Sequence, residues 1–232
     1  MKKTEVLALL KKNSDQRGID HWNKKPRGLT SFGIGLTKVR KLAKEIGRDR
    51  KLAGQLWATD NYEARIIGLL IDDPKEMTAE QAEQQVDELH HGMLSHVFSS
   101  CDATLSKTKF AFELADQWTH SSDPVRRRCG YGLIYELSKK NPKGMDDAYL
   151  IALVNRIRKT IAGEEMWVQE AMTTALLGIG KRNQKLNKAA IAAAKAIGHI
   201  EIDYGDDNQC ESMDLMKHLT SDHLKKKFAD PK

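Results

Sequence analysis

The segment HVFSSCDATLS, residues 96–106, places the carboxylate of Asp102 directly after a run of apolar and small residues. Two interpretations remain open. Aspartate is a preferred helix N-cap residue, and the pattern alone slightly favours Asp102 as the cap of a following helix. If Phe98 and Asp102 instead share one helix, they are four positions apart and project from one face. A carboxylate beside an aromatic ring can stabilise a cationic transition state, such as the oxocarbenium-like sugar formed when a glycosidic bond breaks.

Basic residues cluster at the expected turns between helices. The clusters are Arg126, Arg127 and Arg128; Lys139, Lys140 and Lys143; Arg156, Arg158 and Lys159; and Lys181, Arg182 and Lys185. Together with helix N-termini, such clusters suit successive phosphates of a nucleic-acid backbone, without contacts to the bases. Consecutive helical positions diverge by about 100°, so at most two of three adjacent arginines face one groove. For any single Lys or Arg, a solvated surface charge is the commoner outcome.

Two further segments contain residue types that bind metal ions. The histidine pair in ELHHG (88–92) lacks the HExxH arrangement, and adjacent helical residues diverge. The segment HIEIDYGDDNQCES (199–212) matches no calcium-loop spacing, and we expect an ordered acidic loop over residues 201–210. Cys101, Cys129 and Cys210 form no CxxC pair and are expected to be free. There is also no Gly-rich phosphate loop. The sequence therefore predicts no metal and no cofactor.

Helical periodicity dominates the elements that must position these groups, and period-2 alternation is rare. The clearest helical segments are residues 39–47, 63–71, 109–118, 130–140, 148–161 and 170–180. Pro124 suits the first turn of a helix capped by Ser122 or Asp123. Residues 16–35, rich in glycine and polar side chains, are predicted to form an irregular lead-in that caps the array or lies on a ligand.

The helical segments also suggest a repeat. If Arg65, Arg128 and Glu170 are equivalent, their offsets are 63 and 42 residues. The second offset matches the roughly 40–47 residues of a two-helix HEAT-type unit, and the first implies an extra helix or a degenerate repeat. We therefore predict an all-α superhelical array with a concave basic face, as a single domain over residues 1–232 in which residues 199–232 form an acidic loop and a helical cap.

Bulk properties narrow the class of protein. The chain has 38 Lys and Arg against 32 Asp and Glu, a net charge of +6, so a polyanionic partner is electrostatically favourable. A segment of about 18 consecutive apolar residues is absent, and the Lys-rich start lacks the features of a signal peptide. We expect a soluble, cytoplasmic, monomeric protein with no membrane partner.

The assembled residues resemble the DNA alkylation repair family, the HEAT-like alkylpurine DNA glycosylases of the AlkD type, as a divergent branch. Their order and spacing carry the resemblance more than any one sharp motif. The segments are FGIGLTKVRKLAKEIG (32–47), LWATDNYEARIIGLLIDDP (56–74), SSCDATLSKTKFAFELADQW (99–118), DPVRRRCGYGLI (123–134), WVQEAMTTALLGIGKRN (167–183) and AIGHIEIDYGDDNQCES (196–212).

The resemblance implies binding of duplex DNA and excision of cationic purines such as 3-methyladenine or 7-methylguanine. It places the aspartate that stabilises the sugar cation at Asp102 and an arginine on the DNA backbone at Arg128. The family's two tryptophans fall on Phe98 and Thr174, which is a departure from the pattern. Losing an indole removes a contact worth about 0.5–2 kcal/mol.

Two hypotheses follow. The first is an alkylpurine DNA glycosylase with Asp102 as catalytic residue. The second is a non-catalytic HEAT-like module that binds nucleic acid or protein through the same face. The retained Asp102 favours the first, and Thr174 favours the second. In either case Arg127, Lys181 and Arg182 are additional candidates for phosphate contacts.

Overall fold

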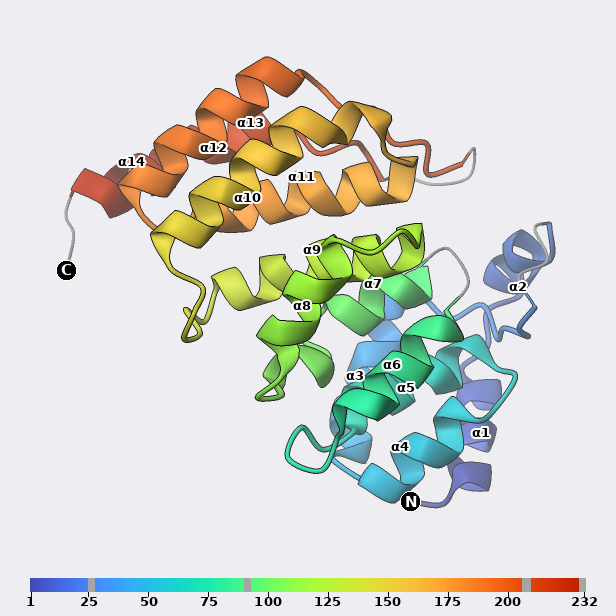
Figure 1. Ribbon diagram of the computed structural model, residues 1–232. Coiled ribbons are helices and arrows are strands. Elements are labelled where there is room, and N and C mark those ends of the chain that lie inside the picture. Colours follow the sequence, from blue (N-terminus) through green and yellow to red (C-terminus); the bar gives the residue numbers. More distant parts are fainter. Residues whose placement is uncertain (25–27, 90–92, 206–209, 230–232) are drawn as a thin grey trace. The chain divides into compact units, whose positions relative to one another are not determined.

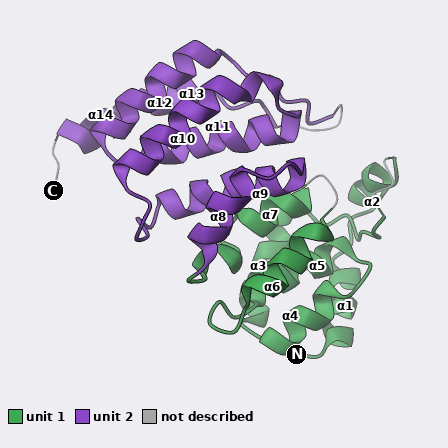
Figure 2. Cartoon of the chain, in the orientation of Figure 1, with its two compact units in different colours: residues 1–109 green, residues 110–232 purple. Residues whose placement is uncertain are grey.

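The described part of the chain is helical. The computed structural model describes residues 1–24, 28–89, 93–205 and 210–229, and within these ranges it contains no β-strand (Figure 1). The predicted all-α class is confirmed. The chain divides into two compact units, residues 1–109 and 110–232 (Figure 2), and each is described by itself. The single domain expected over residues 1–232 stays a prediction.

In the first unit, the central helix pair is α4 and α5, and α3 and α7 also pack against α5. Helix α5 buries most of its circumference. A Cβ at Gly68 would lie 2.9 Å from the carbonyl oxygen of Ala53, so the backbones of α4 and α5 approach closely there. The described elements are α1 (Lys3–Lys12), α2 (Gln16–Asn23), α3 (Leu36–Ile46), α4 (Arg50–Trp57), α5 (Tyr62–Ile71), α6 (Ala79–Asp87), α7 (Met93–Ser99) and the 3-10 turn η1 (Leu105–Lys107).

The irregular lead-in predicted for residues 16–35 is wrong over its first part, which forms α2. Asp15 caps this helix. Its side chain accepts hydrogen bonds from the backbone N–H groups of Arg17 and Gly18, which have no carbonyl partner within the first turn. The glycine content of the segment serves tight packing, since a Cβ at Gly18 would lie 2.1 Å from the carbonyl oxygen of Gly33. The N-terminal segment is therefore a packed part of the first unit.

In the second unit, α9 packs against both α8 and α11, and α12 packs against α10 and α11. Helix α9 begins at Pro124, and Asp123 caps it by accepting a 2.7 Å hydrogen bond from the N–H of Val125, as predicted. A Cβ at Gly130 would lie 2.7 Å from the amide nitrogen of Thr119, so α8 and α9 meet at backbone distance. The described elements are α8 (Ala111–Thr119), α9 (Pro124–Ser138), α10 (Asp147–Thr160), η2 (Ile161–Gly163), α11 (Met166–Gly180), α12 (Gln184–Ile197), α13 (Leu215–Leu219) and α14 (Asp222–Ala229).

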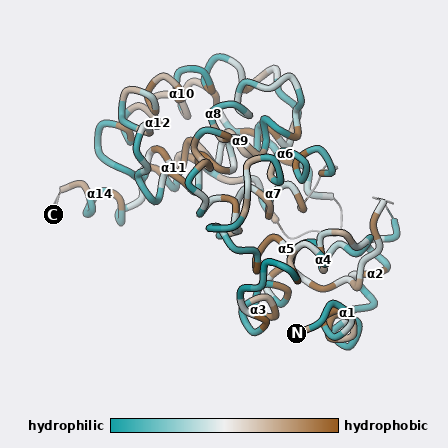
Figure 3. Tube along the Cα trace, turned by 60° about the horizontal axis from the view of Figure 1, so that its bottom comes forward, coloured by the Kyte–Doolittle hydropathy of each residue, from teal (hydrophilic) through white to brown (hydrophobic). Residues whose placement is uncertain are grey.

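Hydropathy follows this packing. Figure 3 shows hydrophobic residues recurring along helices such as α9 and α11, which carry ten buried residues each. Helix α14, by contrast, buries only Leu224 among its described residues and is rich in lysine. In the described ranges, no helix is long and apolar enough to span a lipid bilayer.

A buried carboxylate holds the segment after α2 in place. Glu63 is 0% exposed, and its carboxylate accepts from the hydroxyl of Ser31 at 2.7 Å and from the N–H groups of Phe32 and Ile34 at 3.0 and 3.1 Å. Because a carboxylate can only accept, all three donors are satisfied by one side chain. Glu63 thereby fixes residues 31–34 to the start of α5.

We expect Glu63→Gln to lower the free energy of unfolding by roughly 1–3 kcal/mol. The amide NH₂ of glutamine is a donor, and in place of a carboxylate oxygen it would face the N–H and O–H donors of residues 31–34. Urea unfolding followed by circular dichroism measures the change. The control is Glu76→Gln, an exposed glutamate of the same unit, which should leave stability within about 0.5 kcal/mol. Equal midpoints for the two variants would contradict the role of Glu63.

Candidate nucleic-acid interface

Asp102 lies in a turn beyond the end of α7. Cys101 and Asp102 have φ of 56° and 60°, and the N–H of Ala103 donates to the carbonyl of Ser100 at 3.0 Å. Two successive left-handed residues closed by this bond end the helix. Both interpretations from the sequence are therefore wrong in their geometry: Asp102 shares no helix with Phe98, and the residue before η1 is Thr104.

The carboxylate of Asp102 is accessible. Its side chain is 68% exposed, and Nζ of Lys107 lies 3.2 Å from Oδ1 and donates to the Asp102 carbonyl at 2.6 Å. A non-glycine residue at positive φ costs about 1–3 kcal/mol, less for aspartate than for most side chains. The turn thus presents a carboxylate to solvent from a strained backbone, with one ammonium beside it.

Phe98 occupies a different environment. Its side chain is 0% exposed and belongs to the core of the first unit. The contact with deoxyribose expected from the sequence would require the ring to leave this core. In the structure Phe98 is a packing residue, so Asp102 has no exposed Phe98 ring beside it.

Arg128 is also largely internal. Its side chain is 6% exposed, Nη2 lies 3.3 Å from Oε2 of Glu170, and the guanidinium lies 5.0 Å from the ring centroid of Trp167. These contacts join α9 to α11 with an ion pair and a cation–π interaction. The backbone contact predicted for Arg128 stays a prediction.

Thr174 and Arg127, two other predicted site residues, form hydrogen bonds or ion pairs within the second unit. Thr174 is half-buried, and its hydroxyl donates to the carbonyl of Glu170 at 2.9 Å on the same helix. Arg127 forms a forked ion pair with Glu164, with Nη2 at 2.7 Å from Oε2, and donates to the carbonyls of Ser121 and Ser122. Neither side chain offers a broad apolar surface to a sugar.

Lys181 and Arg182 line a cleft of about 540 Å³, which we call the basic cleft. Lys139 at the end of α9 and Lys227 from α14 supply two further cations. Nζ of Lys139 lies 4.0 Å above the ring of Tyr135, and Nζ of Lys227 donates to the carbonyl of Lys181 at 2.6 Å. The sequence placed Lys139 in a cluster but missed Lys227, which lies 46 residues after Lys181 and joins it only through packing.

The electrostatics of the basic cleft favour an anion. Burial lowers the pKa of Lys181, and the neighbouring charges of Lys139 and Lys227 lower it further. Burial also lowers the pKa of Arg182, against the opposing effect of Asp147. Nη2 of Arg182 donates to Oδ1 of Asn141, while its Nη1 is buried without a hydrogen-bond partner in the described part of the chain. A bound phosphate would relieve the repulsion among these cations.

The other candidate segments add no site. His90 and His91, and Asp206 and Asp207 of the acidic loop, lie outside the described residues. Across the residues that the structure does describe, no group of three or more His, Cys, Asp or Glu side chains is placed to hold a metal ion. The absence of a metal and of a cofactor remains an expectation.

Comparisons with known proteins bear on the whole chain. The family described as DNA alkylation repair enzyme matches residues 6–205. Uncharacterised proteins of Listeria innocua and Listeria monocytogenes are 23% and 22% identical over 225 residues, with 93% of each chain covered. A solved structure described as a new family of proteins related to the HEAT-like repeat DNA glycosylases, with affinity for branched DNA structures, is 22% identical. It matches with a TM-score of 0.79 over 98% of this chain and 94% of its own, which confirms the predicted HEAT-like repeat fold.

We expect Glu170→Gln to destabilise the second unit, because it removes the carboxylate of the largely buried ion pair with Arg128. The loss should be about 2–3 kcal/mol, below the roughly 3–5 kcal/mol for a fully buried pair, since the Glu170 side chain is 17% exposed. Thermal and urea unfolding measure it. Glu165→Gln, at an exposed glutamate beside the same helix, is the control. A loss no larger than that of the control would show that Arg128 does not depend on Glu170.

Proposed function

The chain belongs to the DNA alkylation repair enzyme family, and we propose that it binds DNA through the phosphate backbone at the basic cleft. The observation that carries the proposal is the gathering of four cations, Lys139, Lys181, Arg182 and Lys227, in one cleft whose described lining contains no carboxylate. An excess of positive charge concentrates a polyanion by long-range attraction.

The cations of the cleft are held in place by the fold. Lys227 is fixed through its bond to the Lys181 carbonyl, and Arg182 through its bond to Asn141. Lys139 is held between the Tyr135 ring and Glu136, with Nζ 3.0 Å from Oε1. Side chains that are ordered before binding lose less conformational entropy when a phosphate arrives.

Contacts of this kind place no requirement on base sequence. We propose that the primary ligand is duplex DNA. The structural neighbour is described as having affinity for branched DNA structures, and a junction presents the same phosphates at higher local density. We therefore propose that branched DNA binds this chain at least as tightly as a linear duplex does.

A second candidate function is excision of alkylated purines such as 3-methyladenine or 7-methylguanine. It is favoured by the exposed carboxylate of Asp102 on its positive-φ turn. In the proposed step, the bond between C1′ and the cationic base breaks and its electron pair neutralises the base. Asp102 stabilises the sugar cation, and water adds to C1′ with loss of a proton. The buried Phe98 and the small Thr174 favour the alternative, a non-catalytic DNA-binding module.

For DNA binding, we expect Lys181→Ala to weaken affinity and to make its salt dependence shallower. Each lost phosphate contact reduces the magnitude of the negative slope of log K against log salt by about 0.9 for duplex DNA. Fluorescence anisotropy with a linear duplex and a four-way junction, at several salt concentrations, gives both quantities. Lys188→Ala, at an exposed lysine of α12 outside the cleft, is the matched control. Slopes that are the same for both variants, or no DNA binding by the wild type at low salt, would contradict the proposal.

For base excision, we expect release of 7-methylguanine from methylated DNA by the wild type. Asp102→Asn should slow it by about 10²–10³-fold, the scale for losing one electrostatic stabiliser. Chromatography of the released base measures the rate, with Asp60→Asn, at an exposed aspartate of the same unit, as the control. No release by wild type that still binds DNA would identify a non-catalytic module. Equal release by wild type and Asp102→Asn would show that Asp102 takes no part in the reaction.

A further inference from the structure

The contacts within the basic cleft account for two of its lysines and leave a third free. Nζ of Lys139 lies 3.0 Å from Oε1 of Glu136, so this charge is paired. Nζ of Lys227 donates to the carbonyl of Lys181 at 2.6 Å and thereby satisfies a carbonyl at the end of α11. The exposed ammonium of Lys181 itself has neither a hydrogen bond nor an ion pair within the described ranges. It therefore offers all three of its N–H donors to a ligand.

The charges at the cleft do not cancel. Of its four cations, Lys139 is paired with one carboxylate, and the carboxylate of Asp147 acts on Arg182. Four positive and two negative charges leave an excess of +2. This excess lies on Lys181 and Lys227, and both side chains are exposed. A ligand that carries two negative charges would therefore neutralise the cleft.

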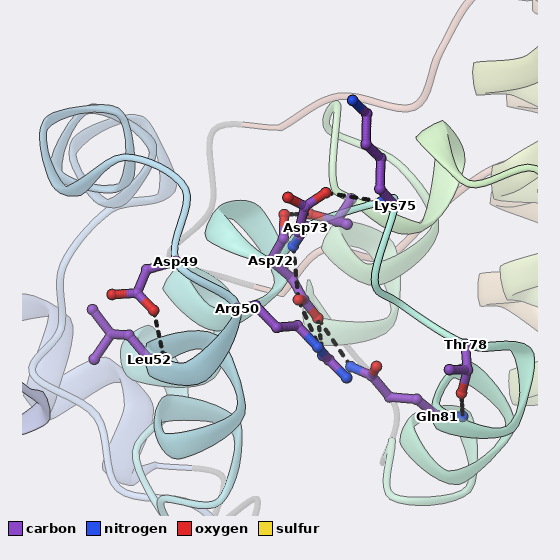
Figure 4. Close-up of polar contacts among 9 residues, drawn as sticks. Asp49, Arg50, Leu52, Asp72, Asp73, Lys75, Thr78 and Gln81 are labelled. Carbon is purple, nitrogen blue, oxygen red and sulfur yellow. Dashed lines mark hydrogen bonds and ion pairs between the residues drawn. The ribbon is translucent and has the colours of Figure 1, made fainter.

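A cation that lines a cavity is not enough to bind an anion, as a second cavity of this chain illustrates. It has a volume of about 390 Å³ and lies in the first unit between α4 and the side of α6. Nη1 of Arg50 lies 3.1 and 2.9 Å from the two carboxylate oxygens of Asp72 (Figure 4). An anion at Arg50 would have to compete with this carboxylate. The ammonium of Lys181 has no such competitor.

We propose that Lys181 and Lys227 bind the terminal phosphate monoester of a DNA strand end in preference to an internal phosphodiester. The inference rests on the proposed function, because it names the phosphate of DNA that the basic cleft binds. An internal phosphodiester has one negative charge, whereas a phosphate monoester has about −1.5 to −2 at pH 7 and three acceptor oxygens. The monoester thus matches both the excess charge and the N–H donors that the two lysines have left.

The position of the cleft also favours a strand end. The cleft lies between the C-terminal ends of α9 and α11, and Lys227 of α14 bounds it through its contact with the Lys181 carbonyl. A terminal phosphate is attached to DNA on one side only, whereas an internal phosphate carries a sugar on each side. The terminal group can therefore enter a bounded cleft while the rest of the strand stays outside.

Duplexes of one sequence that differ only at their 5′ ends test the inference. The ends carry a hydroxyl, a phosphate or a methyl-esterified phosphate, which keeps the phosphorus but has a single negative charge. In fluorescence anisotropy we expect the phosphate end to bind about tenfold more tightly than the hydroxyl end, the scale of one added charge-assisted contact. The methyl ester should recover only a minor part of this gain. A parallel set modified at the 3′ ends shows which terminus of the strand enters the cleft.

The variants are chosen to keep the fold. Lys181→Gln and Lys227→Gln remove one charge each at exposed positions, and a glutamine amide at 227 retains a donor for the Lys181 carbonyl. Each should abolish the gain from the terminal phosphate without lowering the unfolding temperature. Lys188→Gln, at an exposed lysine of α12 outside the cleft, is the control and should keep the gain.

The outcomes separate this inference from the proposed function. Equal binding of hydroxyl and phosphate ends, at both termini, by a wild type that binds DNA would overturn the inference alone. Equal binding of the phosphate and its methyl ester would do the same, as would a gain that survives in both Lys181→Gln and Lys227→Gln. If the wild type binds none of the duplexes, the proposed function falls together with the inference.

Discussion

Close approach of helix backbones is the constraint on which both units depend. Gly68 and Gly130 mark the points where α5 meets α4 and α9 meets α8, and a Cβ at either would collide with main-chain atoms of the partner. Helices packed at this distance leave little freedom to the side chains one turn away. Arg128 lies two residues before Gly130, about 200° around the helix, and therefore faces Glu170 and Trp167 of α11 instead of α8. A residue whose type suggests a DNA contact is thereby used to join two helices.

The same constraint explains how far the sequence could predict the fold. The apolar residues at helical spacing in the segments now seen as α5, α9 and α11 follow from the burial of most of each helix, and the N-cap at Asp123 is a local hydrogen bond. Both were therefore predictable. Helix α2 was missed because its helical state depends on the Asp15 cap and on the contact of Gly18 with Gly33, which outweigh its glycine content.

The candidate site was less predictable, for two physical reasons. The positive φ of Cys101 and Asp102 has only a weak signal in the sequence, since aspartate adopts it more readily than most residues but cysteine does not. Burial of Phe98 depends on which face of α7 meets α5, a tertiary property. Lys181 and Arg182 were predicted correctly as members of a basic cluster at the end of α11, whereas Lys227 enters the cleft only because α14 returns to that end.

The basic cleft and the cavity between α4 and α6 differ in whether their charged side chains are paired with opposite charges. In the basic cleft, burial is the main cause of the lowered pKa of Lys181, and the charges of Lys139 and Lys227 lower it further. A bound anion would stabilise these charges, and such binding is screened by salt. In the cavity of about 390 Å³ between α4 and α6, Arg50 is paired with Asp72, and Glu88 is paired with Arg65. An anion therefore gains more from the basic cleft than from a cavity whose charges are already paired within the fold.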